Sequence, residues 1–335
     1  MIRTLILFTI SLPLCIGNLL NAQERPLGHI AFYNVENLFD IDDDPEIRDD
    51  DFTPAGELKW DTVKYADKIM KLGKVFSAMA VPDIIGLSEI ENRKVLEALV
   101  SGKQMSRYNY QIVHFDSPDR RGIDVALLYR QNKFTPFFSQ NIAFEDPSDP
   151  EFKTRDILHV KGLYHGDTLN IFVNHWPSRR GGKEEKRIMA AKLLRKTVDG
   201  LLTDNPEAKI VIMGDLNDDP SNKSVRKNLL AHDKVKKMMP SDLYNTSAKT
   251  FKQGYGTLFY RGTWNLFDQI IISQSMLSGK SGTWFYKPDS FRVFAPEWMR
   301  VKDGDYAGAP FRTFVSGKYQ NGYSDHYPVF IEISK

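Results

Sequence analysis

Residues 209–217 read KIVIMGDLN, an apolar run that ends abruptly in polar side chains. Aliphatic runs of this length are typical of a buried strand. The same order recurs at 30–37 (IAFYNVEN), 84–92 (IIGLSEIEN) and 170–176 (NIFVNHW). Because strand ends in an α/β sheet converge on a crevice, we expect these polar groups to meet although they lie far apart in the sequence.

Other apolar or alternating runs predict the remaining strands. The expected strands are 29–33, 83–87, 108–115, 124–129, 158–164, 169–173, 209–213, 269–272 and 329–333. Two amphipathic stretches, 61–80 and 183–202, predict helices because their apolar residues recur at helical spacing. This mixture favours a mixed sheet, or two sheets with helices outside. No repeat or linker interrupts the chain after the N-terminal segment, so we expect one domain over residues 23–335.

Composition excludes several classes of protein. The chain has 335 residues, 41% of them hydrophobic, which is too many for a disordered protein. Its 45 basic and 43 acidic residues give a net charge of +2, which is too small to attract a polyanion. Binding to a polyanion would therefore require a local cluster of basic residues. A single cysteine excludes a disulfide framework and cysteine-rich metal sites.

The N-terminal segment has the order of a secretory signal peptide. Arg3 precedes an uncharged, largely apolar stretch, and the small residue Ala22 marks the expected cleavage point. Removal of residues 1–22 takes away Arg3 and the only cysteine, Cys15, so the net charge falls to +1. We therefore expect an exported protein, periplasmic or extracellular. An uncleaved anchor is the alternative, against which Pro13 and Asn18 argue.

The polar groups at the strand ends have a common chemistry. Asparagine amides and carboxylates suit a hard divalent cation such as Mg²⁺, which binds through oxygen. The imidazoles of His175 and His326 are then free for proton transfer or charge stabilisation. Each group taken alone is more often a helix cap or a turn residue. Because such polar residues follow several strands in turn, a shared catalytic site explains them better than a series of unrelated helix caps.

Six motifs of this chain, taken in order, resemble those of the endonuclease/exonuclease/phosphatase superfamily. They are Asn34-Val35-Glu36-Asn37-Leu38, Ser88-Glu89, Asn174-His175-Trp176-Pro177-Ser178, Gly214-Asp215-Leu216-Asn217, Phe267-Asp268-Gln269-Ile270 and Ser324-Asp325-His326-Tyr327-Pro328. The resemblance spans residues 29–331. It implies a four-layered α/β sandwich, with two central mixed β-sheets flanked by helices.

The resemblance also implies a metal site. Glu89 would be the principal metal ligand, and Asn34 and Asp325 would complete or support the site. The expected ion is Mg²⁺, with Mn²⁺ or Ca²⁺ as alternatives. Glu36 matches a position that is acidic in only some members, so the resemblance gives it no firm role.

The catalytic groups follow from the same motifs. Asp215 would orient or deprotonate the attacking water, and Asn217 would bind the phosphate. His326, oriented by Asp268, would contact the phosphate or transfer a proton. His175 would stabilise or protonate the leaving oxygen. Water attack on a phosphodiester builds negative charge on the phosphate, which a cation and fixed hydrogen-bond donors can neutralise. The imidazoles and Asp215 are candidate acid and base groups for the proton transfers.

Four residues are expected to contact the substrate: Asn174, Arg121, Arg179 and Arg180. The two last belong to a basic segment, 179–187, that would form a rim beside the crevice. The alternative is that 183–187 is the solvated first turn of a helix. Arg261, which is near several aromatic residues in the sequence, could add phosphate contacts and stacking surfaces.

Together these features predict an exported, Mg²⁺-dependent phosphodiesterase, with a nuclease acting on DNA or RNA as the leading interpretation. A phosphatase or a lipid phosphodiesterase of the same superfamily is the alternative, because one fold serves many phosphate substrates. A noncatalytic phosphate-binding surface protein is a further one. We expect a monomer with no obligate protein partner.

Overall fold

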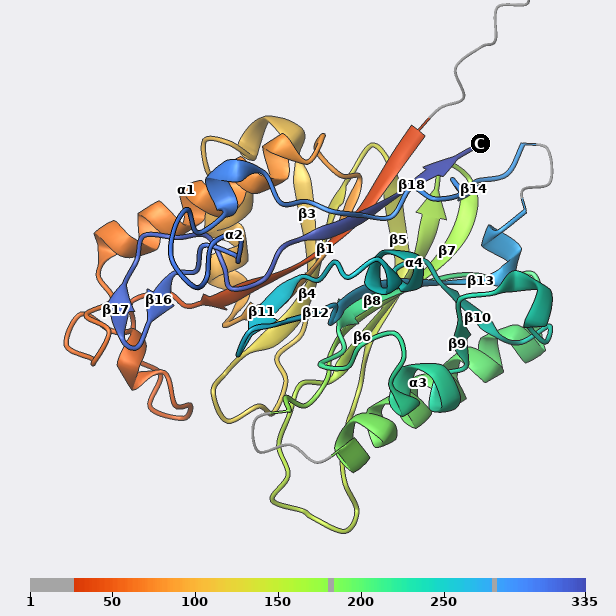
Figure 1. Ribbon diagram of the computed structural model, residues 1–335, viewed down its shortest axis with the longest axis horizontal. Coiled ribbons are helices and arrows are strands. Elements are labelled where there is room, and N and C mark those ends of the chain that lie inside the picture. The colour runs from red at the N-terminus through yellow and green to blue at the C-terminus, as the bar shows by residue number, and fades with distance from the viewer. Residues whose placement is uncertain (1–26, 180–183, 279–281) are drawn as a thin grey trace, which may run out of the picture.

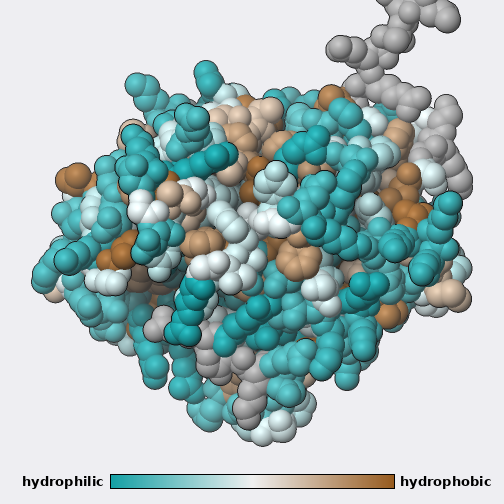
Figure 2. Space-filling view, in the orientation of Figure 1, coloured by the Kyte–Doolittle hydropathy of each residue, from teal (hydrophilic) through white to brown (hydrophobic). Residues whose placement is uncertain are grey.

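The computed structural model describes residues 27–179, 184–278 and 282–335, so the expected signal peptide at 1–22 lies outside the described residues. Two β-sheets pack face to face, with helices on their outer faces (Figure 1). The expected four-layered sandwich is therefore confirmed. Within the described ranges, no helix is long and apolar enough to cross a membrane. The face in Figure 2 is mostly hydrophilic, and its apolar side chains lie in small separate groups.

The first sheet has the strand order β14-β18-β1-β2-β4-β3, and β15 pairs with β18. Its strands are β1 (Leu27–Leu38), β2 (Ile84–Ile90), β3 (Tyr110–His114), β4 (Asp124–Arg130), β14 (Phe285–Tyr286), β15 (Arg292–Val293) and β18 (Val329–Ser334). β1 and β2 are parallel, because helix α1 (Thr62–Ala78) lies between them in the chain. The other pairs of this sheet are antiparallel.

The second sheet has the order β5-β6-β7-β8-β13-β10-β9. Its strands are β5 (Phe134–Ile142), β6 (Ile157–Tyr164), β7 (Asp167–His175), β8 (Lys209–Asp215), β9 (Ala231–His232), β10 (Leu243–Asn245) and β13 (Asp268–Ser273). β7 and β8 are parallel and are joined through helix α3 (Glu184–Asp204). Two short hairpins lie outside the sheets: β11 (Leu258–Tyr260) with β12 (Thr263–Asn265), and β16 (Phe314–Val315) with β17 (Lys318–Tyr319).

Helices cover the outer face of each sheet. α1 and α2 (Arg93–Ser101) pack on the first sheet, and α3 packs on the second. α1 begins as the sequence predicted, because the Asp61 carboxylate accepts hydrogen bonds from the first turn. α3 matches the expected helix at 183–202, although residue 183 is not described. The sequence analysis missed α2 and the short α4 (Ala248–Lys252). The remaining helical turns are Asp50–Phe52, Ser106–Tyr108, Ser224–Asn228, Val235–Lys237, Gln274–Met276 and Glu297–Met299.

The two sheets approach closely through apolar side chains. Phe32 and Ile331 of the first sheet and Met213 of the second belong to one buried cluster between the sheets. Gly86 marks the tightest point, since a Cβ atom there would lie 2.4 Å from the Met213 sulfur. This core fixes the two sheets relative to each other, and therefore the spacing across the crevice at their ends.

The topology brings the polar strand ends to one edge of the sandwich. Parallel pairing places the carboxyl ends of β1 and β2 together, and likewise those of β7 and β8. The antiparallel partners start where those strands end: Asp268 opens β13 directly opposite Asp215. His326 lies just before β18, which pairs with β1.

His159 on β6 should make stability depend on pH. Its ring stacks on Phe172 at a centroid distance of 4.3 Å and is almost completely buried. Burial lowers the pKa of His159 to about 4. In the unfolded chain His159 has an ordinary pKa near 6.5. Between about pH 6.5 and 4 it is therefore protonated in the unfolded chain but neutral in the folded protein. We expect the free energy of unfolding to fall between about pH 6.5 and 4, by up to about 1.4 kcal/mol per pH unit from this residue.

Urea unfolding at pH 7, 6 and 5 measures this effect. His159→Gln, which does not titrate, should lose some stability at pH 7 but show a flatter dependence than the wild type. Equal slopes in the two proteins would contradict the assignment.

Candidate active site

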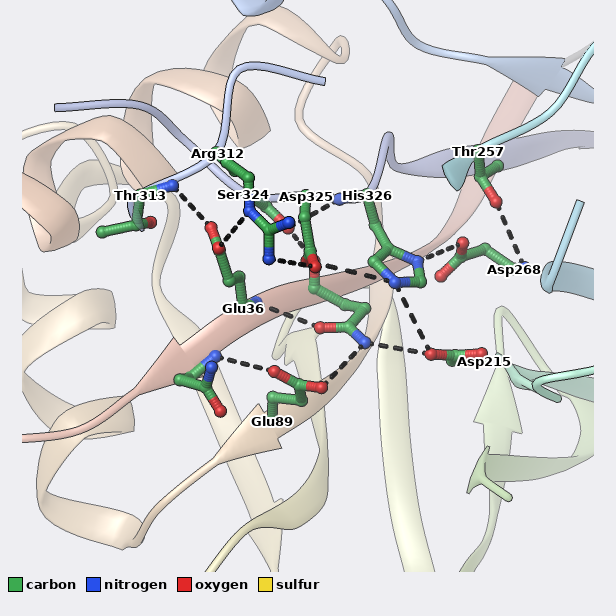
Figure 3. Close-up of polar contacts among 12 residues, drawn as sticks. Glu36, Glu89, Asp215, Thr257, Asp268, Arg312, Thr313, Ser324, Asp325 and His326 are labelled. Atoms are coloured by element: carbon green, nitrogen blue, oxygen red, sulfur yellow. Dashed lines mark hydrogen bonds and ion pairs between the residues drawn. The ribbon is translucent and has the colours of Figure 1, made fainter. Parts of the chain in front are cut away.

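A carboxylate–imidazole pair forms the centre of the polar cluster at these strand ends (Figure 3). His326 Nδ1 donates to Asp268 Oδ2 at 2.7 Å, and Nε2 lies 3.8 Å from Asp215 Oδ2. All three side chains are buried. The two aspartates are a register pair of β8 and β13, so the sheet itself fixes their spacing. The expected orientation of His326 by Asp268 is thus present.

The charges of His326 and its two aspartates shift the pKa values of one another. Burial alone would lower the pKa of His326, but the carboxylates of Asp268 and Asp215 raise it well above its ordinary value. Burial raises the pKa of Asp215 to about 6, and the His326 charge acts in the opposite direction. At neutral pH the centre therefore holds an imidazolium between carboxylates.

His175, at the end of β7, approaches the same carboxylate. Its Nε2 lies 3.6 Å from Asp215 Oδ2. Burial lowers the pKa of His175 well below its ordinary value, and the nearby charges of Arg155 and Arg121 act in the same direction. The buried Nδ1 has no hydrogen-bond partner. His175 is thus a neutral imidazole, which favours stabilisation of a leaving oxygen over delivery of a proton.

Two of the expected metal-binding residues lie side by side next to Asp215. The Asn34 amide nitrogen donates to Asp215 Oδ2 at 3.0 Å and lies 3.4 Å from Glu89 Oε1. The other Glu89 oxygen accepts from the Asn37 N–H at 2.9 Å. Glu89 sits where the register of β2 shifts, with φ at +63°. A non-glycine residue in this region is strained, which is common at functional sites.

Arg312 joins the third expected ligand to the strand β1. Its guanidinium lies 2.9 Å from Asp325 Oδ2 and 3.2 Å from Glu36 Oε1. The other Glu36 oxygen accepts from the Thr313 N–H at 2.6 Å. Burial raises the pKa of Glu36 to about 7. Arg312 was not predicted as a site residue, because it lies in a turn-rich segment whose pattern gives no signal of its partners.

The donor set fits a hard divalent cation. Burial alone would lower the pKa of Arg312, but the nearby charges of Asp325, Glu36 and Glu89 raise it. Against these three carboxylates stand Arg312 and the buried Lys68, whose pKa burial lowers to about 8. The site therefore has an excess of negative charge and oxygen ligands, which suits such an ion. Glu89 and Asp325, both partly exposed, are the carboxylates best placed to bind it.

A family model described as the Endonuclease/Exonuclease/phosphatase family matches residues 29–335. The chain belongs to this family. Its members are phosphoric ester hydrolases that depend on divalent metals, in agreement with the acidic, histidine-containing centre. The resemblance inferred from the six motifs is therefore confirmed. No curated protein sequence matches the chain significantly.

Solved structures share the fold at low sequence identity. TDP2 from D. rerio, complexed with single-strand DNA product, has a TM-score of 0.56 and 15% identity, over 92% of this chain and 99% of that one. The human Nocturnin catalytic domain has a TM-score of 0.56 and 17% identity, over 92% and 95%. A mannosyl-6-phosphatase from Bacteroides thetaiotaomicron has a TM-score of 0.56 and 16% identity, over 92% and 100%.

Two asparagines of the family motifs support the loop after β7. Asn174 is fully buried; its amide donates to the Met213 carbonyl at 3.2 Å and accepts from the Trp176 indole at 3.1 Å. Asn174 therefore positions Trp176, and the expected contact of Asn174 with substrate stays a prediction. Asn217 lies beside Asp215 and donates to the Trp176 carbonyl at 2.9 Å. Arg155, which the sequence analysis missed, donates to the same carbonyl at 2.8 Å.

Most of the expected basic rim is paired within the protein. Arg179 binds Asp219 Oδ2 at 3.1 Å and the Asn217 carbonyl at 3.0 Å, and it stacks on Phe267. Lys186 pairs with Asp146, and Arg187 pairs with Asp218. These three cations are therefore less available to substrate than the sequence indicated.

The other two arginines expected to bind substrate are Arg121 and Arg180. Arg180 lies outside the described residues. Arg121 is half-exposed and lies 3.6 Å from Asp119 Oδ1. Its charge reaches His175, so it stands at the crevice. Arg121 is thus the described arginine best placed to meet a phosphate there.

Substitution of Asp268 should separate catalysis from folding. We expect Asp268→Asn to lower kcat on a phosphodiester by about 10²-fold or more, because His326 loses the carboxylate that orients and charges it. Initial rates and a circular dichroism spectrum measure the effect and the fold.

Asp218→Asn provides the matched control. Asp218 is also buried after β8, but its carboxylate contacts Ser224, Arg187 and Arg179 and not the catalytic pair. We expect a lower Tm with nearly unchanged kcat, because the substitution leaves Arg187 without its charged partner. Loss of activity in Asp218→Asn, or normal activity in Asp268→Asn, would contradict these roles.

Proposed function

We propose that this protein is an exported, Mg²⁺-dependent phosphodiesterase, a nuclease that hydrolyses DNA or RNA by water attack. The observation that carries the proposal is the buried imidazolium of His326, held by Asp268 and facing Asp215, beside the carboxylate of Glu89. This arrangement provides a base for water and fixed positive charge for the developing negative charge on phosphate.

The roles of the residues follow from their charges. Asp215, with a pKa of about 6, is mainly ionised at neutral pH and can orient water and accept its proton. The His326 imidazolium stabilises negative charge on the phosphate oxygens, and neutral His175 donates a hydrogen bond to the leaving oxygen. When bound by Glu89, Asn34 and Asp325, Mg²⁺ supplies Lewis-acid neutralisation of the phosphate.

Two observations bear on the substrate. The structure of D. rerio TDP2, which shares this fold, contains a single-strand DNA product, and this supports a nucleic acid. The pairing of Arg179, Lys186 and Arg187 within the chain favours the alternative of a smaller phosphate ester, as does the similar fold of the mannosyl-6-phosphatase. We keep the nuclease as the leading proposal and the phosphatase as the second.

A parallel assay tests the proposal. The mature protein is incubated with Mg²⁺, Mn²⁺ or chelator and with plasmid DNA, RNA, sphingomyelin and an inositol phosphate. We expect nucleic-acid cleavage that requires the metal and is abolished in folded Asp215→Asn and His326→Ala. Hydrolysis of a phosphomonoester without nucleic-acid cleavage would replace the nuclease with a phosphatase. Failure with every substrate would favour a noncatalytic phosphate-binding protein.

Export has its own test. We propose that cleavage after Ala22 releases a mature protein that begins at Gln23, because the preceding segment has the order of a signal peptide. Cell fractionation followed by mass spectrometry of the intact protein should find that species in the periplasmic or extracellular fraction. Recovery of the full-length chain in the cytoplasm would contradict export.

A further inference from the structure

A cavity of about 390 Å³ opens beside the hairpin β11–β12, outside the catalytic centre described above. Its walls include the rings of Tyr255, Trp264 and Tyr327, and Arg300 lies at its side. The volume is sufficient for a small flat ring system, within the range of ligand pockets. None of the residues assigned a role in the chemistry lines it.

The cavity is physically attached to the catalytic pair through Thr257. The Tyr327 N–H donates to the Thr257 carbonyl at 2.9 Å, and Tyr327 directly follows His326. The Asp268 N–H lies 3.4 Å from the Thr257 hydroxyl, and Figure 3 shows Thr257 beside Asp268. One residue thus joins the cavity wall to both members of the pair.

The three rings of the cavity differ in exposure: Tyr327 is buried, Trp264 is partly buried and Tyr255 is exposed. Trp264 stacks on Tyr327, with centroids 6.1 Å apart and planes 19° from parallel. Gly256 allows close approach of the hairpin backbone, because a Cβ there would lie 2.5 Å from the Asn265 carbonyl oxygen. Tyr255 is 63% exposed, and among the described residues no aromatic ring packs on it. Rigid aromatic surfaces of this kind stack bases at a low cost in conformational entropy.

Arg300 adds a positive charge that the protein does not neutralise. Its Nε donates to the Ala295 carbonyl at 2.7 Å, and no carboxylate pairs with it among the described residues. Arg179 and Arg187, in contrast, both bind aspartates. An unneutralised guanidinium beside aromatic walls suits a ligand that joins a flat ring to a phosphate.

We propose that this cavity binds one nucleobase of a nucleic-acid strand, stacked on Trp264 and Tyr255, while Arg300 binds a phosphate of the same strand. The proposal rests on the nuclease function proposed above and names the site that would hold the nucleotide next to the cleaved bond. It also accounts for the exposed ring of Tyr255, which lies just before a hairpin that contributes no strand to either large sheet.

Binding without turnover provides the test. Fluorescein-labelled hexathymidylate is titrated with the protein in chelator, and anisotropy gives Kd at several salt concentrations. We expect Trp264→Ala and Tyr255→Ala each to raise Kd about tenfold, from the loss of base stacking. Arg300→Gln should weaken binding and reduce the slope of log Kd against log salt by about one.

Phe137→Ala is the matched control, because Phe137 is an aromatic residue of similar exposure, 57%, on the outer strand β5. Its Kd should equal that of the wild type. The Tyr255 ring is largely exposed, so Tyr255→Ala should leave Tm unchanged. A weaker Kd in this variant therefore reports lost binding and not misfolding.

A second readout uses two p-nitrophenyl esters, of thymidine 5′-phosphate and of methyl phosphate. The wild type should prefer the thymidine ester through a lower KM, and Trp264→Ala should lose that preference while it keeps its rate on the methyl ester. Unchanged Kd in both aromatic variants, or displacement of the probe by a hexose 6-phosphate but not by thymidine 5′-phosphate, would overturn the proposal. If neither ester is cleaved but stacking-dependent binding persists, the phosphodiesterase function fails and the cavity assignment stands.

Discussion

The direction of four strands is the constraint on which the site depends. Because α1 and α3 return the chain to the starting edge of each sheet, β1 and β2 run in parallel, and so do β7 and β8. Asn34, Glu89, His175 and Asp215 consequently reach the same end of the sandwich. The close contact of the sheets at Gly86 and Met213 then sets the distance between the two halves of the crevice.

Charge balance within the crevice is the second organising factor. A buried charge without a partner is costly, so each ionised group here has one or more opposite charges nearby. His326 stands between Asp268 and Asp215, and Arg312 stands between Glu36 and Asp325. The two imidazoles differ in charge because carboxylates surround His326, whereas burial and arginine charges act on His175. One residue type thereby serves two chemical purposes.

Much of the fold was predictable from the sequence, because the strands are long apolar runs and two helices have clear periodicity. α2 was missed because it is short, and β5 because Pro136 and exposed polar residues interrupt its pattern. The candidate catalytic residues were predictable because motifs keep them at strand ends. The hydrogen bonds of Asn174 and Arg179 within the protein were not predictable, since their partners, Met213 and Asp219, come from other segments of the chain. Arg155 and Arg312 were missed for the same reason.

The position of the hairpin β11–β12 has a consequence for the diversification of this enzyme scaffold. The hairpin is inserted between β10 and β13, and it pairs with neither large sheet. Thr257 and Asn265 anchor its base, where the Thr257 N–H donates to the Asn265 carbonyl at 2.8 Å. The tip of the hairpin, residues 261–262, lies outside the β11–β12 pairing and outside the register of β8 with β13. Variation at this tip would therefore change the surface beside the proposed cavity while the pairing of Asp215 with Asp268 stays the same.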